Sequence, residues 1–134
     1  MQRFRRTWPV AVLLVGSLGV ALRSVAADVD TLRQASAPAA EAARYLSGDA
    51  LIATTSVLAL IAVLTGRSWA PWAMLGWMVT LLVVVAWVLF IAVGSNGPPI
   101  LLRLGAWIVC SLLSAVAVHL VRRAWATNGR NAAA

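Results

Sequence analysis

Four carboxylates are the side chains of this sequence that could serve as general acids or bases. They are Asp28, Asp30, Glu41 and Asp49, all within one short segment. Asp28 and Asp30 are two positions apart, so on a helix they would not face each other, and the segment contains no His or Cys to complete a catalytic pair. We therefore interpret these carboxylates as solvated groups that balance nearby arginines, with Asp49 as a helix cap.

His119 and Cys110 are the single representatives of the two residue types that most often bind transition metals. A zinc or haem site needs further ligands, which a chain with one His and one Cys does not supply. An intrachain disulfide is excluded for the same reason. The sequence thus predicts no catalytic residue, no cofactor and no metal site. A ligand shared between His119 and another subunit stays open.

The composition of the chain indicates which kind of secondary structure carries these residues. Hydrophobic residues make up 62% of the chain and charged residues 11%, whereas a soluble domain has about a quarter of its residues charged. Long apolar stretches separate the charged ones. A membrane-crossing helix needs about 20 mainly apolar residues. We therefore predict an all-α integral membrane protein, a single domain over residues 1–134.

Charge-free stretches and turn residues predict a bundle of four transmembrane helices. Glycines and prolines between residues 94 and 99 divide one stretch that is too long for a single span. Gly48 is suited to end a short outer helix, and Asp49 and Ser68 to cap the spans that follow them. The expected spans are about 8–27 with a helical extension to about 35, then 50–66, 69–94 and 99–121. An outer loop at 28–49, with a short surface helix at 37–47, and a tail at 122–134 complete the chain.

The first span has two interpretations. Basic residues before an apolar stretch, with Val25-Ala26-Ala27 ahead of Asp28, are typical of a cleaved signal peptide. Apolar residues nevertheless recur at helical spacing beyond Arg23, which a cleaved signal would not require. We favour a retained anchor whose Arg23 extends to the interface.

The arginines predict the orientation of the bundle. With four spans, one side holds no acid and contains Arg3, Arg5, Arg6, Arg67, Arg122, Arg123 and Arg130. The opposite side contains all four acids together with Arg23, Arg33, Arg44 and Arg103. Because cytoplasmic loops are enriched in basic residues, we expect both termini in the cytoplasm and the 28–49 loop outside. The exclusive use of Arg over Lys indicates a GC-rich bacterial genome, and hence the bacterial cytoplasmic (inner) membrane.

A net charge of +7 raises nucleic acid as a partner. The arginines flank apolar spans and form no basic face with interleaved aromatics, so we expect no nucleic-acid binding. Anionic lipids at the cytoplasmic face are the expected partners of these charges.

Two arrangements at the spans could matter for assembly. Arg103 is about one turn inside the fourth helix, where a charge is costly unless it reaches the surface or pairs, and Asp49 at the same boundary is a possible ion-pair partner. Small residues spaced four apart allow helices to approach closely. They occur as Gly76 and Thr80, and again as Ala106, Cys110 and Ser114. We favour packing of these residues within the bundle, with an interface to another chain as the alternative.

Three functions fit these features. The favoured one is a non-enzymatic accessory or assembly subunit of a larger membrane complex, or a self-associating membrane protein. The second is a small carrier or pore for an uncharged or lipid-like substrate, which would need no buried charge. The third is a membrane anchor that shares a cofactor ligand with another subunit.

Overall fold

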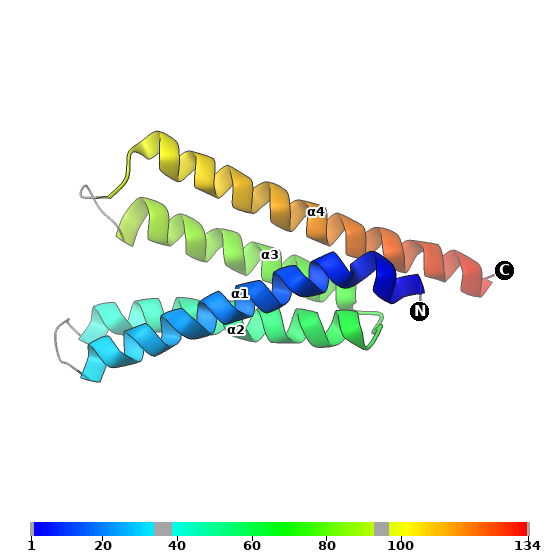
Figure 1. The fold of residues 1–134 in the computed structure, drawn as a ribbon, viewed down its shortest axis with the longest axis horizontal. Coiled ribbons are helices and arrows are strands. Elements are labelled where there is room, and N and C mark those ends of the chain that lie inside the picture. The colour runs from blue at the N-terminus through cyan, green and yellow to red at the C-terminus, as the bar shows by residue number, and fades with distance from the viewer. Residues whose placement is uncertain (1, 34–38, 93–96, 134) are drawn as a thin grey trace.

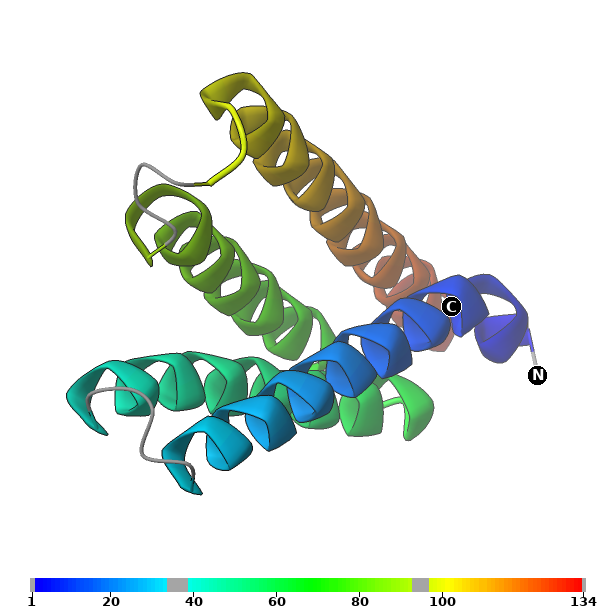
Figure 2. The same cartoon turned by 60° about the vertical axis from the view of Figure 1, so that its left-hand side comes forward.

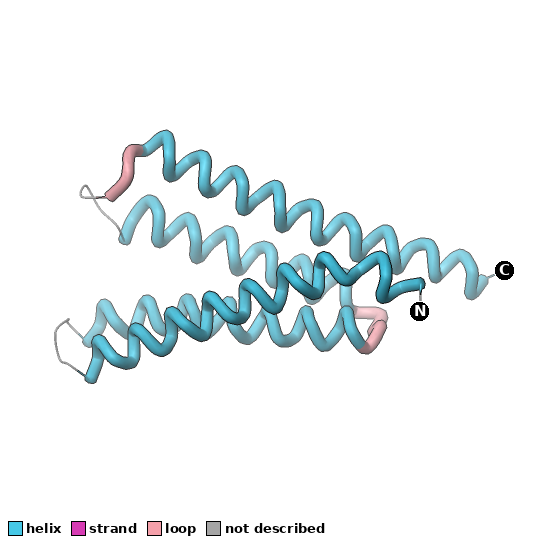
Figure 3. Tube along the Cα trace, viewed as in Figure 1, coloured by secondary structure: helices cyan, strands magenta, loops and turns pink. Residues whose placement is uncertain are grey.

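The computed structural model describes residues 2–33, 39–92 and 97–133, and these ranges are helical apart from short turns (Figure 3). The elements are α1 (Gln2–Arg33), α2 (Ala39–Leu64), α3 (Ala70–Trp87), a π-helical turn η1 (Val88–Ala92), and α4 (Ile100–Ala133). Four segments are long and apolar enough to cross a membrane: Thr7–Asp30, Ala43–Leu64, Ala70–Ile91 and Ile100–Gly129. The prediction of an all-helical chain with four candidate spans is confirmed.

The helices form two antiparallel hairpins, α1 with α2 and α3 with α4 (Figure 1). Contacts join α1 to α2, α2 to α3, α3 to α4 and α4 back to α1. Both chain termini and the α2–α3 turn lie at one end of the bundle, which we call the closed end. Seen from a second direction, the hairpins converge at the closed end and diverge along their α1–α4 side at the opposite, open end (Figure 2).

The hydrophobic core is concentrated toward the closed end. Its buried members come from the early part of α1 and α3 and the late part of α2 and α4, namely Val10, Leu14, Ala59, Ala62, Val63, Ala70, Met74, Trp77, Ala117, Val118 and Val121. Many other large apolar side chains point outward, as expected where lipid is the solvent. Association of such helices relies on close packing, because lipid tails are as apolar as the side chains. Four of these core residues are alanines, which suits close approach.

The turn between α2 and α3 closes this end of the bundle through backbone hydrogen bonds. Gly66 has φ of 66°, a left-handed conformation that Gly adopts without a steric penalty. The Arg67 amide donates to the Ala62 carbonyl at 3.0 Å, and the Gly66 amide to the Val63 carbonyl at 3.4 Å. This is the pattern of a Schellman motif. The Trp125 indole donates to the Arg67 carbonyl at 2.7 Å, which ties α4 to the turn.

Two expected N-caps are absent, and packing of α2 against α3 explains the first. Helix α2 begins at Ala39 and runs unbroken through Gly48 and Asp49, so the separate outer helix and the capping role of Asp49 are wrong. A Cβ placed on Gly48 would lie 3.2 Å from Cγ1 of Val84. The glycine thus allows α2 and α3 to approach, which offsets the roughly 1 kcal/mol that Gly costs inside a helix. At α3 the cap residue is Trp69, without a side-chain hydrogen bond, and Ser68 has no capping role.

Helices α1 and α4 both run past the expected membrane spans. Helix α1 continues to Arg33, as the apolar spacing predicts, and α4 continues through the expected tail to Ala133. The third span ends as the π-helical turn η1. Half of the predicted break at residues 94–99 lies outside the described residues, as does the expected junction at residues 35–37 between the extension of the first span and the surface helix.

Candidate functional site

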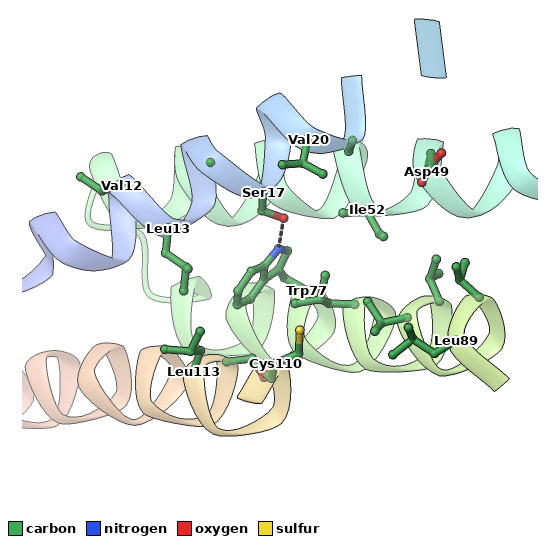
Figure 4. A pocket seen from close by; sticks show the side chains of 17 residues that line it. Val12, Leu13, Ser17, Val20, Asp49, Ile52, Trp77, Leu89, Cys110 and Leu113 are labelled. Atoms are coloured by element: carbon green, nitrogen blue, oxygen red, sulfur yellow. Dashed lines mark hydrogen bonds between the residues drawn. The ribbon is translucent and has the colours of Figure 1, made fainter. Parts of the chain in front are cut away.

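A cavity of about 560 Å³ opens between the two hairpins. All four helices and η1 contribute to its wall, and 17 residues line it (Figure 4). The wall is mainly aliphatic, with Val12, Leu13, Val20, Ile52, Leu89 and Leu113 among its members. Figure 4 shows Trp77 in the middle of the cavity and Asp49 with Leu89 at one end. The cavity therefore extends from the core toward the open end.

The cavity exists because small residues face it and because the hairpins diverge. Gly16 lines it, and a Cβ built on Gly16 would meet no atom within 4 Å. At the open end, aromatic side chains join α2 to α3 and α3 to α4. Tyr45 of α2 meets Trp87 of α3 edge to face, with 5.2 Å between the ring centroids. The Trp107 indole of α4 donates to the Leu82 carbonyl of α3 at 3.3 Å.

A buried hydrogen-bond network forms one wall of the cavity. The Trp77 indole N–H lies 3.1 Å from Oγ of Ser56 and 3.3 Å from Oγ of Ser17, and the two hydroxyls are 3.2 Å apart. Trp77 is 1% exposed. An unpaired indole N–H would be costly in an apolar interior, so both serines satisfy a polar group that links α1, α2 and α3. Sequence reasoning missed this network. Single hydroxyls inside apolar stretches, at Ser17 and Ser56, were the available signal.

Asp49 is the charged residue among the described side chains that line the cavity. Its side chain lies beside that of Asp28 on α1. Oδ2 of Asp28 is buried and has no hydrogen-bond partner. The interpretation of Asp28 as a fully solvated group is therefore wrong, whereas Asp30 is exposed. The helix spacing separates Asp28 from Asp30 as expected, but antiparallel pairing of α1 and α2 brings Asp28 to Asp49.

The other predicted site residues lie apart from this pair. The Arg103 Nε donates to the Pro98 carbonyl at 2.7 Å, so the described contact of Arg103 is local and its pair with Asp49 stays a prediction. Gly76 is exposed and would have no atom within 4 Å of a Cβ. The bundle as described therefore does not show the favoured internal packing of Gly76, and an interface to another chain stays a prediction.

The second group of small residues lies on α4, and its members become more buried toward the C-terminal end of that helix. Ala106 is exposed, Cys110 is half-buried and Ser114 is 1% exposed. Both Cys110 and Ser114 line the cavity. The Ser114 hydroxyl donates to the Cys110 carbonyl at 2.8 Å, a back-bond that satisfies the hydroxyl within its own helix.

The described residues contain no group of three or more His, Cys, Asp or Glu side chains that could hold a metal ion. His119 lies away from the cavity, on the exposed surface of α4. The cavity thus offers an apolar volume with a few hydroxyl, indole and carboxyl groups. That chemistry suits binding of an apolar molecule. No protein-family model, curated protein or solved structure matches this chain.

Proposed function

We propose that this chain is a small, non-enzymatic, multi-pass protein of the bacterial cytoplasmic membrane that binds a lipid-like molecule between its hairpins. The supporting observation is the cavity of about 560 Å³ with its mainly aliphatic wall. Cavities of roughly 300–1,000 Å³ with apolar walls and few polar groups are typical ligand sites. The ligand class follows from the wall, because an apolar chain matches the aliphatic side chains that make up most of it.

The position of the cavity also fits a membrane-derived ligand. It extends from Trp77 toward the diverging end of the hairpins, and the helices around it present apolar side chains outward. A lipid-like molecule could therefore enter from the bilayer without crossing a charged surface. A carrier of this kind needs no ionisable group in the middle of the membrane.

Filling part of the cavity should weaken this binding. Gly16→Leu places a leucine side chain in the cavity, where a Cβ would find open space. Displacing about two CH₂ groups of a ligand at about 0.8 kcal/mol each lowers affinity about tenfold or more. The measurement is photolabelling of the protein in nanodiscs by a long-chain alkanol that carries a diazirine, with the labelled residues identified by mass spectrometry.

Gly19→Leu is the matched control. Gly19 lies on the same helix, also with no atom within 4 Å of a Cβ, but it does not line the cavity. We expect Gly19→Leu to label like the wild type. Absence of label on cavity residues of the wild-type protein, or equal labelling of both variants, would contradict the proposal.

A role as an accessory subunit remains the second candidate, supported by the outward face of α3. Gly76 is exposed with open space above it, and Thr80 follows one helical turn later. Small residues in this spacing favour close contact with another helix. Extraction in mild detergent with crosslinking should then retain a discrete larger partner or a self-associated form. A monodisperse lone monomer would argue against this role.

The charge distribution supports placing both termini in the cytoplasm and the α1–α2 connection outside. In a Cys110→Ser background, Ala43→Cys should react with a membrane-impermeant thiol reagent added to intact cells. Ser68→Cys, in the α2–α3 turn, should react only after permeabilisation. Both positions are exposed in the protein, so accessibility depends on the side of the membrane. The reverse pattern would invert the proposed orientation.

A further inference from the structure

A second hollow, of about 670 Å³, lies on the outer surface between α3 and α4, near the closed end. One part of its wall is apolar and includes Leu75 and Met78 of α3 with Ala115 and Val118 of α4. Val118 belongs to the core and Met78 packs against it, so this wall rests on the best-packed part of the bundle. The hollow is separate from the cavity between the hairpins, since the two share no lining residue.

The rest of the wall is basic. His119, Arg122 and Arg123 line it from α4, at spacings that place them on one helix face. All three are exposed. The chain has no acidic residue after Asp49, so neither α3 nor α4 supplies a carboxylate to balance these charges. The acids of α1 and α2 lie near the open end.

We infer that this hollow binds an anionic phospholipid, with the phosphate at Arg122 and Arg123 and an acyl chain along Leu75 and Val118. The charge complementarity is specific, because guanidinium groups bind phosphate oxygens in a bidentate manner. The apolar wall continues from the basic groups into the candidate span Ile100–Gly129. A free phosphate would leave that wall uncovered, whereas a phospholipid covers both parts. Basic pockets between transmembrane helices bind such head groups.

The test compares the lipids retained by the purified full-length protein. The protein is placed in nanodiscs of phosphatidylcholine with a minor share of phosphatidylglycerol. Native mass spectrometry then releases it from the nanodiscs and identifies the lipids that stay bound by their mass. The wild type should retain phosphatidylglycerol in preference to phosphatidylcholine. Arg122→Gln with Arg123→Gln should lower that retention on the order of tenfold or more, given about 1 kcal/mol per arginine near a charged membrane surface.

Arg5→Gln with Arg67→Gln is the matched control. It removes the same charge from the same end of the bundle, from exposed residues that do not line the hollow. We expect its retention to remain within about twofold of the wild type, since its charges act only at long range. An equal loss of phosphatidylglycerol retention in both double variants would indicate general attraction to anionic lipid and no specific site. That result would overturn the inference.

A third variant tests the acyl chain. Ala115→Trp fills the apolar part of the hollow without changing charge, and Val116→Trp places the same indole side chain on an exposed neighbour outside it. Retention of phosphatidylglycerol should fall in Ala115→Trp and stay at the wild-type level in Val116→Trp. Unchanged retention in Ala115→Trp would indicate a simple phosphate site and would also overturn the inference, as would equal retention of the two lipids by the wild type.

Discussion

Replacing Trp77 by Ala is expected to lower the free energy of unfolding by about 3–5 kcal/mol, the range for a large aromatic residue removed from a packed core. Trp77 is 1% exposed and belongs to the core. Its indole also joins three helices, because it donates toward Ser17 of α1 and Ser56 of α2. The substitution therefore removes packing and the indole donor that the two hydroxyls share. Reversible unfolding in mixed micelles, followed by circular dichroism, measures the loss.

Trp77→Phe separates the two contributions. Phenylalanine retains most of the ring contact but has no N–H, so its loss should be smaller, on the order of 1–3 kcal/mol for a smaller ring and an unmade hydrogen bond. Trp72→Ala is the control, because Trp72 is 75% exposed on the same helix. It should change stability by less than about 0.5 kcal/mol. Similar losses for Trp77→Ala and Trp72→Ala would show that the core does not form around Trp77.

Replacing Ala59 by Leu is also expected to have a large effect, lowering the free energy of unfolding by about 1–3 kcal/mol. Ala59 is 0% exposed and lies in the core on α2. In a bilayer, a larger apolar side chain gains little from leaving lipid, so the steric cost is not offset by burial. The same unfolding measurement applies, and crosslinking between α1 and α2 should weaken in parallel.

Ala50→Leu provides the comparison for this prediction. It makes the same chemical change on the same helix, at a position that is exposed. We expect no measurable loss there. If Ala59→Leu proved as stable as the wild type, the closed end would have room that the structure does not show.

The number and type of helices could be predicted from the sequence because length and apolarity decide them. Their boundaries could not be fully predicted, and Gly48 shows why. Propensity assigns a glycine at the start of an apolar stretch to a helix end, but close approach of Val84 keeps it inside α2. That contact joins residues far apart in the sequence, so no local pattern contains it.

The candidate site was less predictable than the fold for a similar reason. The cavity depends on how far the two hairpins diverge, and side-chain periodicity within a helix does not determine that angle. The pairing of Asp28 with Asp49 depends on the register between α1 and α2. Likewise, the sequence contains seven tryptophans, and only the packing distinguishes buried Trp77 from exposed Trp72. The basic groups of the second hollow were visible as charges, but not as a site with an apolar wall.

The concentration of the core at one end has a mechanical consequence. Each hairpin acts as a lever whose pivot is the packed core around Leu14, Met74 and Val121. At a rise of about 1.5 Å per residue, roughly 20 residues of helix beyond the pivot give an arm of about 30 Å. A tilt of about 5° would displace the far end by roughly 3 Å over that arm. The α1–α4 side of the cavity can thus widen by roughly 3 Å while the core contacts, and the contact of Tyr45 with Trp87 between α2 and α3, remain almost unchanged.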